Sequence, residues 1–130
     1  MKRLNVLIVA HEFSPILGSE CAEGWNLVTR IAKHHDVTVL YASGSQFSNV
    51  SYVNAVDNFL KNTNVLPGLN LINIDQQRMT LFLTTITKIF VNIGSIGFPV
   101  LYFIGYKYWQ KKVYKIAKQL NDVNNFDIAH

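Results

Sequence analysis

The chain has 130 residues, of which 49% are hydrophobic and 15% charged. This length accommodates one domain with a hydrophobic core, and the composition excludes an intrinsically disordered chain. The single cysteine, Cys21, excludes an internal disulfide framework and is typical of a reducing compartment. The basic start of the chain leads into no secretory cleavage pattern, so we interpret the first apolar run as a strand.

The net charge of +4 is unevenly distributed along the chain. Residues 1–75 carry five basic and six acidic side chains, whereas residues 76–121 carry seven basic side chains and no acidic one. The last nine residues add two aspartates. This asymmetry indicates an anionic partner for one face of the protein, such as a membrane surface, a phosphorylated substrate or a nucleic acid.

Hydrophobic runs and helical spacing predict the elements of the first half. Residues 4–10 form a continuous apolar run, which is typical of a strand buried on both faces. Ser19 is a suitable N-cap for a helix that ends near His34 and His35, which we interpret as a solvated helix end. The β-branched run over 37–42 predicts a second buried strand.

The second half is expected to contain three helices and two strands. Apolar spacing predicts helices over 52–60, 79–93 and about 100–121, and strands over 69–74 and 126–129. The long helix has one apolar face, formed by Tyr102, Tyr106, Trp109, Val113, Ile116, Ala117 and Leu120. Its basic face is formed by Lys107, Lys111, Lys115 and Lys118.

The element order β-α-β-α-β-α-α-β predicts an α/β fold. We expect a Rossmann-like parallel sheet of about four strands with helices on both faces and right-handed crossovers. All of residues 1–130 are assigned to this one domain. Because the chain stops at the end of the fourth predicted strand without a covering helix, we expect the domain to be incomplete at its carboxyl end.

The strand, loop and helix over 6–25 form the first candidate ligand site. Ligands bind outside the carboxyl ends of parallel strands, and a helix N-terminus at that position favours an anion, usually a phosphate. Gly18 would let the backbone approach a phosphate closely, and Ser19 opens the helix; an ordinary loop glycine is the alternative. The two further glycines of a G-x-G-x-x-G fingerprint are missing, which argues against a nicotinamide dehydrogenase.

Two carboxylates and two histidines are further candidates. Glu20 and Glu23 could accept hydrogen bonds from acceptor hydroxyls, although stabilisation of the helix dipole explains them without any substrate and is the commoner reason for first-turn carboxylates. His11 and His130 each follow a predicted strand, so both are candidates to face the ligand crevice, His130 more strongly. The chain has neither an H-E-x-x-H motif nor a cysteine pair, and no metal is expected.

Three motifs in order resemble the amino-terminal domain of family four of the retaining glycosyltransferases, which have the two-domain GT-B architecture. They are GSECAEGW preceded by HEFSP, Tyr108-Trp109-Gln110 before an amphipathic helix, and Phe126-Asp127-Ile128-Ala129-His130. The match is closest to members whose first loop reads Gly-Ser-Glu and then, after three residues, Gly-Trp. The chain departs from the family at Cys21 and Ala22, where the family often has Pro and Gly.

The resemblance implies transfer of a sugar from a nucleotide-sugar donor to a glycan or lipid-linked acceptor. The Gly18 loop would contact the donor phosphates, and His130 would hydrogen-bond the transferring sugar or stabilise the departing diphosphate. His11, Glu20 and Glu23 would bind the acceptor, and the nucleotide-sugar is a co-substrate rather than a cofactor. The donor-binding domain of the family lies beyond position 130, so we expect residues 1–130 alone to be inactive. We also expect the protein to be cytoplasmic, either free or at the inner face of the membrane.

The alternative is a non-catalytic α/β module that binds a membrane surface or a protein partner through its basic helix. Residues 89–106 contain no charge, which reaches the lower limit for a membrane-spanning helix, but glycines and Pro99 interrupt the segment. Contact with the inner face of a membrane through Lys107, Lys111, Lys115 and Lys118 is the stronger form of this hypothesis. A nucleic-acid partner is disfavoured because no recognised binding module is present.

Overall fold

The computed structural model describes residues 2–15, 20–42, 59, 66–74 and 98–130. Within these ranges the strands are β1 (Asn5–Glu12), β2 (Asp36–Ala42), β3 (Leu69–Asn73) and β4 (Ile128–Ala129), and the helices are α1 (Glu20–Ala32) and α4 (Phe98–Asn124). The helices predicted over 52–60 and 79–93 lie outside the described residues, apart from Phe59. The strands and the two other helices agree with the prediction to within a few residues at their ends.

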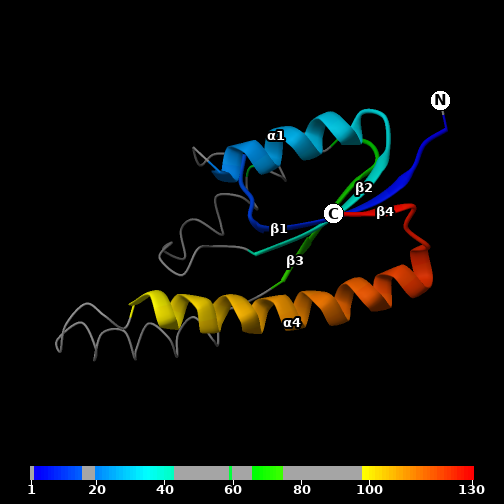
Figure 1. Cartoon of the computed structure of the whole chain (residues 1–130). Helices are drawn as coiled ribbons and strands as arrows, with labels where there is room; N and C mark the ends of the chain where they lie inside the picture. Colours follow the sequence, from blue (N-terminus) through cyan, green and yellow to red (C-terminus); the bar gives the residue numbers. More distant parts are fainter. Residues whose placement is uncertain (1, 16–19, 43–58, 60–65, 75–97) are drawn as a thin grey trace.

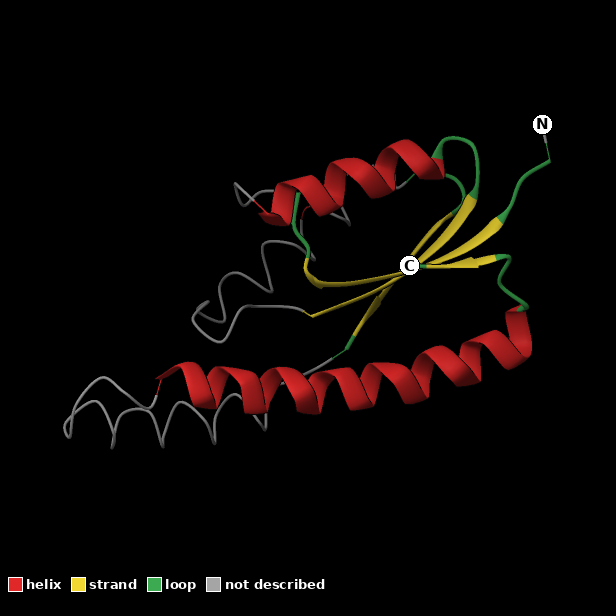
Figure 2. Ribbon diagram, in the orientation of Figure 1, coloured by secondary structure: helices red, strands yellow, loops and turns green. Residues whose placement is uncertain are grey.

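The four strands form one parallel sheet in the order β3-β2-β1-β4. Helix α1 covers one face of the sheet and α4 covers the other (Figures 1 and 2). Parallel neighbours need crossover connections, and helices on both faces are what such connections produce. The predicted Rossmann-like α/β fold is therefore confirmed.

Strand alternation divides the core between the two faces. Val6, Ile8, Val37 and Val39 point toward α1 and pack with Val28 and Ala32 of that helix. The side chains of opposite parity, Leu7 and Leu40, point the other way, toward Trp109 and Val113 of α4. The predicted apolar face of α4 is therefore confirmed from Tyr106 to Leu120 as the surface that covers the sheet, and the side chain of Tyr102 lies outside the described residues.

Helix α4 is terminated by a residue in the left-handed conformation that is held by hydrogen bonds. Asn125 has a φ of +48°, and its backbone N–H donates to the carbonyl of Asn121 at 2.9 Å. The Phe126 N–H donates to the Asn121 side-chain oxygen at 3.2 Å. Asparagine tolerates the left-handed conformation that ends helices, so Asn125 turns the chain into β4.

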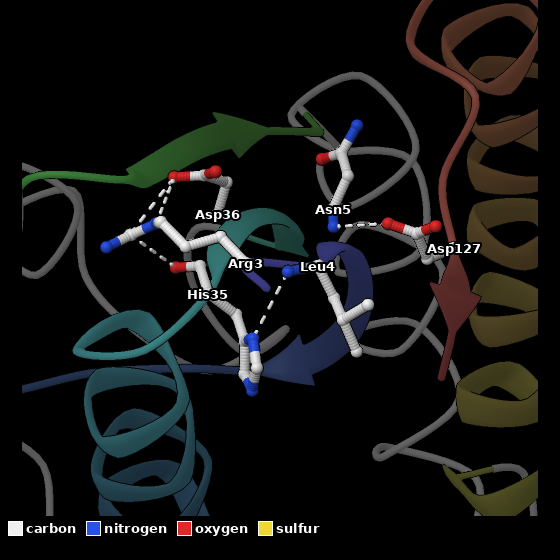
Figure 3. Close-up of polar contacts among 6 residues, drawn as sticks. All are labelled: Arg3, Leu4, Asn5, His35, Asp36 and Asp127. Carbon is white, nitrogen blue, oxygen red and sulfur yellow. Dashed lines mark hydrogen bonds and ion pairs between the residues drawn. The ribbon is translucent and has the colours of Figure 1, made fainter. Parts of the chain in front are cut away.

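Polar contacts join the amino ends of the strands (Figure 3). The Arg3 guanidinium forms an ion pair with Asp36 at 3.0 Å and donates to the His35 carbonyl at 3.0 Å. The Leu4 N–H donates to Nδ1 of His35 at 3.3 Å. On the other side, the Asn5 N–H donates to the Asp127 carboxylate at 2.8 Å. His35 therefore accepts hydrogen bonds that hold the start of β1, in addition to lying just beyond the end of α1.

Candidate functional site

The strand order creates a topological switch point between β1 and β4. The chain proceeds outward from β1 through β2 to β3, and then crosses back to place β4 on the other side of β1. In open α/β sheets, ligands bind in the crevice outside the carboxyl ends of the strands where the order reverses. The loop that leaves β1 therefore occupies the position that the fold offers to a ligand.

The loop after β1 is anchored by residues that the sequence analysis did not single out. Phe13 is 2% exposed, and its ring lies 5.3 Å from the ring of Trp25 on α1 and 5.5 Å from that of Tyr41 on β2. Ser14 is fully buried, and its N–H donates to the Cys21 carbonyl at 3.3 Å. Phe13 continues the apolar character of β1 beyond the two polar residues at positions 11 and 12. This pattern is the sequence signal that could have identified Phe13 as a core residue.

The candidate residues at the start of α1 are only partly described. Gly18 and Ser19 lie outside the described residues, so their predicted contact with a phosphate stays a prediction. Glu20 is the first residue of α1, and Glu23 is exposed one turn further along. Because Ser14 is hydrogen-bonded to the first turn of α1, the amino end of this helix is held beside the carboxyl end of β1.

His11 lies at a β-bulge near the end of β1. Ala10 pairs with Tyr41 and Glu12 with Ala42, so His11 is the extra residue in this strand. Its ring makes edge contacts with Tyr106 and Trp109 of α4, at centroid distances of 5.0 and 4.7 Å. The imidazole is therefore packed against the α4 layer.

His130 is held beside β1 by two backbone hydrogen bonds. Its N–H donates to the Leu7 carbonyl at 2.9 Å, and its carbonyl accepts from the Val9 N–H at 2.8 Å. These bonds place His130 opposite Ile8, which is on the α1 face of the sheet. The His130 side chain is exposed.

The structure therefore does not bring the two candidate histidines together. His130 occupies an α1-face position, and Phe13 packs in the core on that face, whereas His11 is packed against α4. The two residues are also offset along the strands, because Ile8 precedes His11 by three residues, or roughly 10 Å. His130 and the amino end of α1 lie on the same face of the sheet, but His130 is level with Ile8 in the middle of β1, whereas the helix end is held at Ser14, beyond the carboxyl end of this strand.

The four lysines of the basic face lie elsewhere. Lys107, Lys111, Lys115 and Lys118 are exposed on α4, whose opposite side packs on the sheet. A concavity on the outer side of this helix is lined in part by Lys107, Tyr108, Lys111 and Lys115. The basic face and the switch-point crevice are thus separate surfaces.

Two searches of the described part of the chain gave negative results. In this part, no cluster of three or more His, Cys, Asp or Glu side chains is arranged to hold a metal ion. Among the described helices, none combines the length and the apolar character needed to cross a bilayer. Half of the uncharged segment, residues 89–97, precedes α4 and lies outside the described residues.

The fold is a Rossmann-like α/β domain whose strand order reverses between β1 and β4. Comparison of this chain with protein-family models, with curated proteins and with solved structures found no match.

Proposed function

We propose that the chain is the amino-terminal, acceptor-side half of a retaining glycosyltransferase of the GT-B architecture. In this proposal a nucleotide-sugar donor lies across the switch-point crevice, and a glycan or lipid-linked acceptor receives the sugar. The observation that supports the proposal is the topological switch point at β1, with the amino end of α1 held by Ser14 beside the carboxyl end of this strand and His130 on the same face of the sheet.

The chemistry of this site suits an anionic donor. Backbone N–H groups at the amino end of α1 and the positive end of its dipole would attract the diphosphate of the donor. The exposed His130 imidazole would hydrogen-bond the transferring sugar or the charge that develops on the leaving diphosphate. Glu20 and Glu23 would accept hydrogen bonds from acceptor hydroxyls. The packing of His11 against two aromatic rings favours a role in supporting the end of β1 over direct acceptor contact.

Sugar transfer by a protein that joins this chain to a donor-binding half tests the proposal. Because removal of one group that stabilises developing charge costs about 10²–10³ in kcat, His130→Ala is expected to reduce turnover by that factor. His34→Ala is the matched control, since His34 is an exposed histidine at the opposite edge of the sheet. Gly18→Pro is expected to raise KM for the donor. Unchanged turnover in both His130→Ala and Gly18→Pro would contradict the site assignment.

A non-catalytic α/β module is the second candidate function. The exposure of the lysines of α4 and their separation from the crevice favour it, because the surface is available whether or not the crevice binds a donor. Titration with nucleoside diphosphates of the protein that joins this chain to a donor-binding half, followed by amide chemical shifts, distinguishes the two functions. Shifts in Phe13–Glu23 and His130 support the transferase, and their absence up to millimolar nucleotide supports the module.

A further inference from the structure

The side of α4 that faces away from the sheet carries a strong positive charge. Five lysines lie on this helix and all are exposed, namely Lys107, Lys111, Lys112, Lys115 and Lys118. No acidic residue occurs between positions 76 and 121 of the sequence, so no carboxylate of the helix offsets these charges before Asp122. The buried side of the helix is fixed on the sheet by Trp109 and Val113.

Large apolar side chains are exposed on the same surface. Ile104 is 49% exposed, Tyr108 is 51% exposed and Tyr114 is 70% exposed. Ile104, Tyr108, Lys111 and Lys115 follow one another at helical spacings of four, three and four residues, so they form one stripe along the helix. A helix face that only contacts water has no need of this apolar area, so the stripe indicates a partner that is both apolar and anionic.

The outward side of α4 extends beyond the sheet. With 27 residues, α4 is about 40 Å long, whereas the eight residues of β1 span about 26 Å. The first turns of the helix therefore reach past the carboxyl ends of the strands (Figure 1). The concavity beside Tyr108 and Lys111 provides a recess in which a phosphate headgroup would meet lysine amines and an aromatic ring.

We propose that the outward side of α4 docks on an anionic lipid bilayer, with the helix lying parallel to the membrane plane. Lysines near an anionic surface gain Coulomb attraction, while tyrosine and isoleucine side chains enter the boundary between headgroups and acyl chains. The opposite side of the helix stays on the sheet, so docking needs no rearrangement of the core. The switch-point crevice remains accessible, and docking does not depend on the proposed sugar transfer.

Flotation of the chain with lipid vesicles tests the electrostatic part. Binding is expected to vesicles that contain about one-third phosphatidylglycerol and to be absent with phosphatidylcholine alone. Since one lysine near such a surface changes the partition coefficient about fivefold, Lys111→Gln combined with Lys115→Gln should lower it by about 25-fold. Arg30→Gln combined with Lys33→Gln removes the same charge from exposed positions of the α1 region and should leave binding near the unmodified value.

A second pair of variants tests the apolar part. Ile104→Ser is expected to weaken binding severalfold at both about 0.05 M and about 0.5 M salt, because apolar insertion is not screened. Leu27→Ser is the matched control, since Leu27 is 50% exposed but lies on α1. Circular dichroism of each variant checks that the fold is intact.

Three outcomes would overturn the proposal. They are equal binding by both lysine pairs, equal binding to neutral and anionic vesicles, and a dimer in light scattering that Ile104→Ser dissociates. The last outcome would assign the surface to a second copy of the chain. Loss of vesicle binding with sugar transfer retained on a soluble acceptor, or the reverse, separates this proposal from the transferase assignment.

Discussion

Individual polar side chains hold the amino edge of the sheet together. The Arg3–Asp36 ion pair joins the segment before β1 to the start of β2, but its side chains are 46% and 56% exposed. Water screens such pairs, and their contribution to stability is small. His35 accepts a partly buried hydrogen bond, and Gly68 has a constrained backbone conformation. Both residues are therefore expected to contribute more to stability than the ion pair.

Replacement of His35 should destabilise the fold, whereas replacement of its neighbour should not. His35→Ala removes the Nδ1 acceptor of the partly buried Leu4 N–H and is expected to lower the free energy of unfolding by about 1 kcal/mol. The exposed His34 gives a matched control, and His34→Ala should change this free energy by less than about 0.5 kcal/mol. Urea denaturation followed by circular dichroism measures both values. Equal changes in the free energy of unfolding in the two variants would mean that the Nδ1 hydrogen bond does not contribute to stability.

Gly68 is expected to tolerate no larger residue. Its φ is +89°, and an added Cβ would lie 2.6 Å from Nη2 of Arg3 and 2.8 Å from Oδ1 of Asp36. Gly68→Ala should therefore lower the free energy of unfolding by about 1–2 kcal/mol, through backbone strain and displacement of the ion pair. Pro67→Ala, at the exposed preceding position, is the control in the same thermal or urea measurement. A neutral or stabilising Gly68→Ala would contradict the positive φ.

At the scale of secondary structure, the two sides of α4 differ in burial. Trp109 and Val113 on the inner side are buried, while residues between them in sequence, such as Lys111 and Lys112, are exposed. This division follows from the 3.6-residue period, which places residues three and four apart on one side. The inner side therefore determines stability, and the outer side can change without loss of the fold.

Adjacent residues of α4 should consequently differ in their effect on stability. Val113 is 4% exposed and Tyr114 is 70% exposed. Val113→Ala deletes two buried methyl groups and is expected to cost about 2 kcal/mol, from lost transfer free energy and the cavity that remains. Tyr114→Ala removes more atoms but should cost less than about 0.5 kcal/mol. Denaturant titration of the two variants decides the comparison, and a larger loss in Tyr114→Ala would show that the outer side is packed.

At the scale of the whole molecule, the two proposed surfaces occupy different parts of the fold. The proposed donor site lies at the carboxyl ends of the strands on the α1 side, and the basic and apolar stripe lies on the outside of α4. Because α4 covers the opposite face of the sheet, a membrane beneath it would leave α1 facing away from the bilayer (Figure 2). The two proposed activities are therefore expected to be separable by mutation.

The sequence determined the strands and the two helices that the structure describes, and the side of α4 that is buried. Continuous apolar runs identified β1 and β2 because both faces of a central parallel strand are buried, and helical spacing identified the side of α4 that packs on the sheet. The separation of Trp109 and Val113 from the lysines was likewise readable from the periodicity. The predicted sugar chemistry depends on motif resemblance, and the contacts of Gly18 and Ser19 remain predictions.

Only the tertiary structure decided which strands are neighbours and where the histidines lie. An apolar pattern specifies that a strand is buried, but it carries no information on which strand it pairs with, so the placement of β4 beside β1 was not readable. The bulge at His11 and its packing against Tyr106 and Trp109 depend on residues almost one hundred positions away. Register with Ile8 likewise fixed the face that His130 occupies, because parity along a strand becomes a direction only when the partner strand is known.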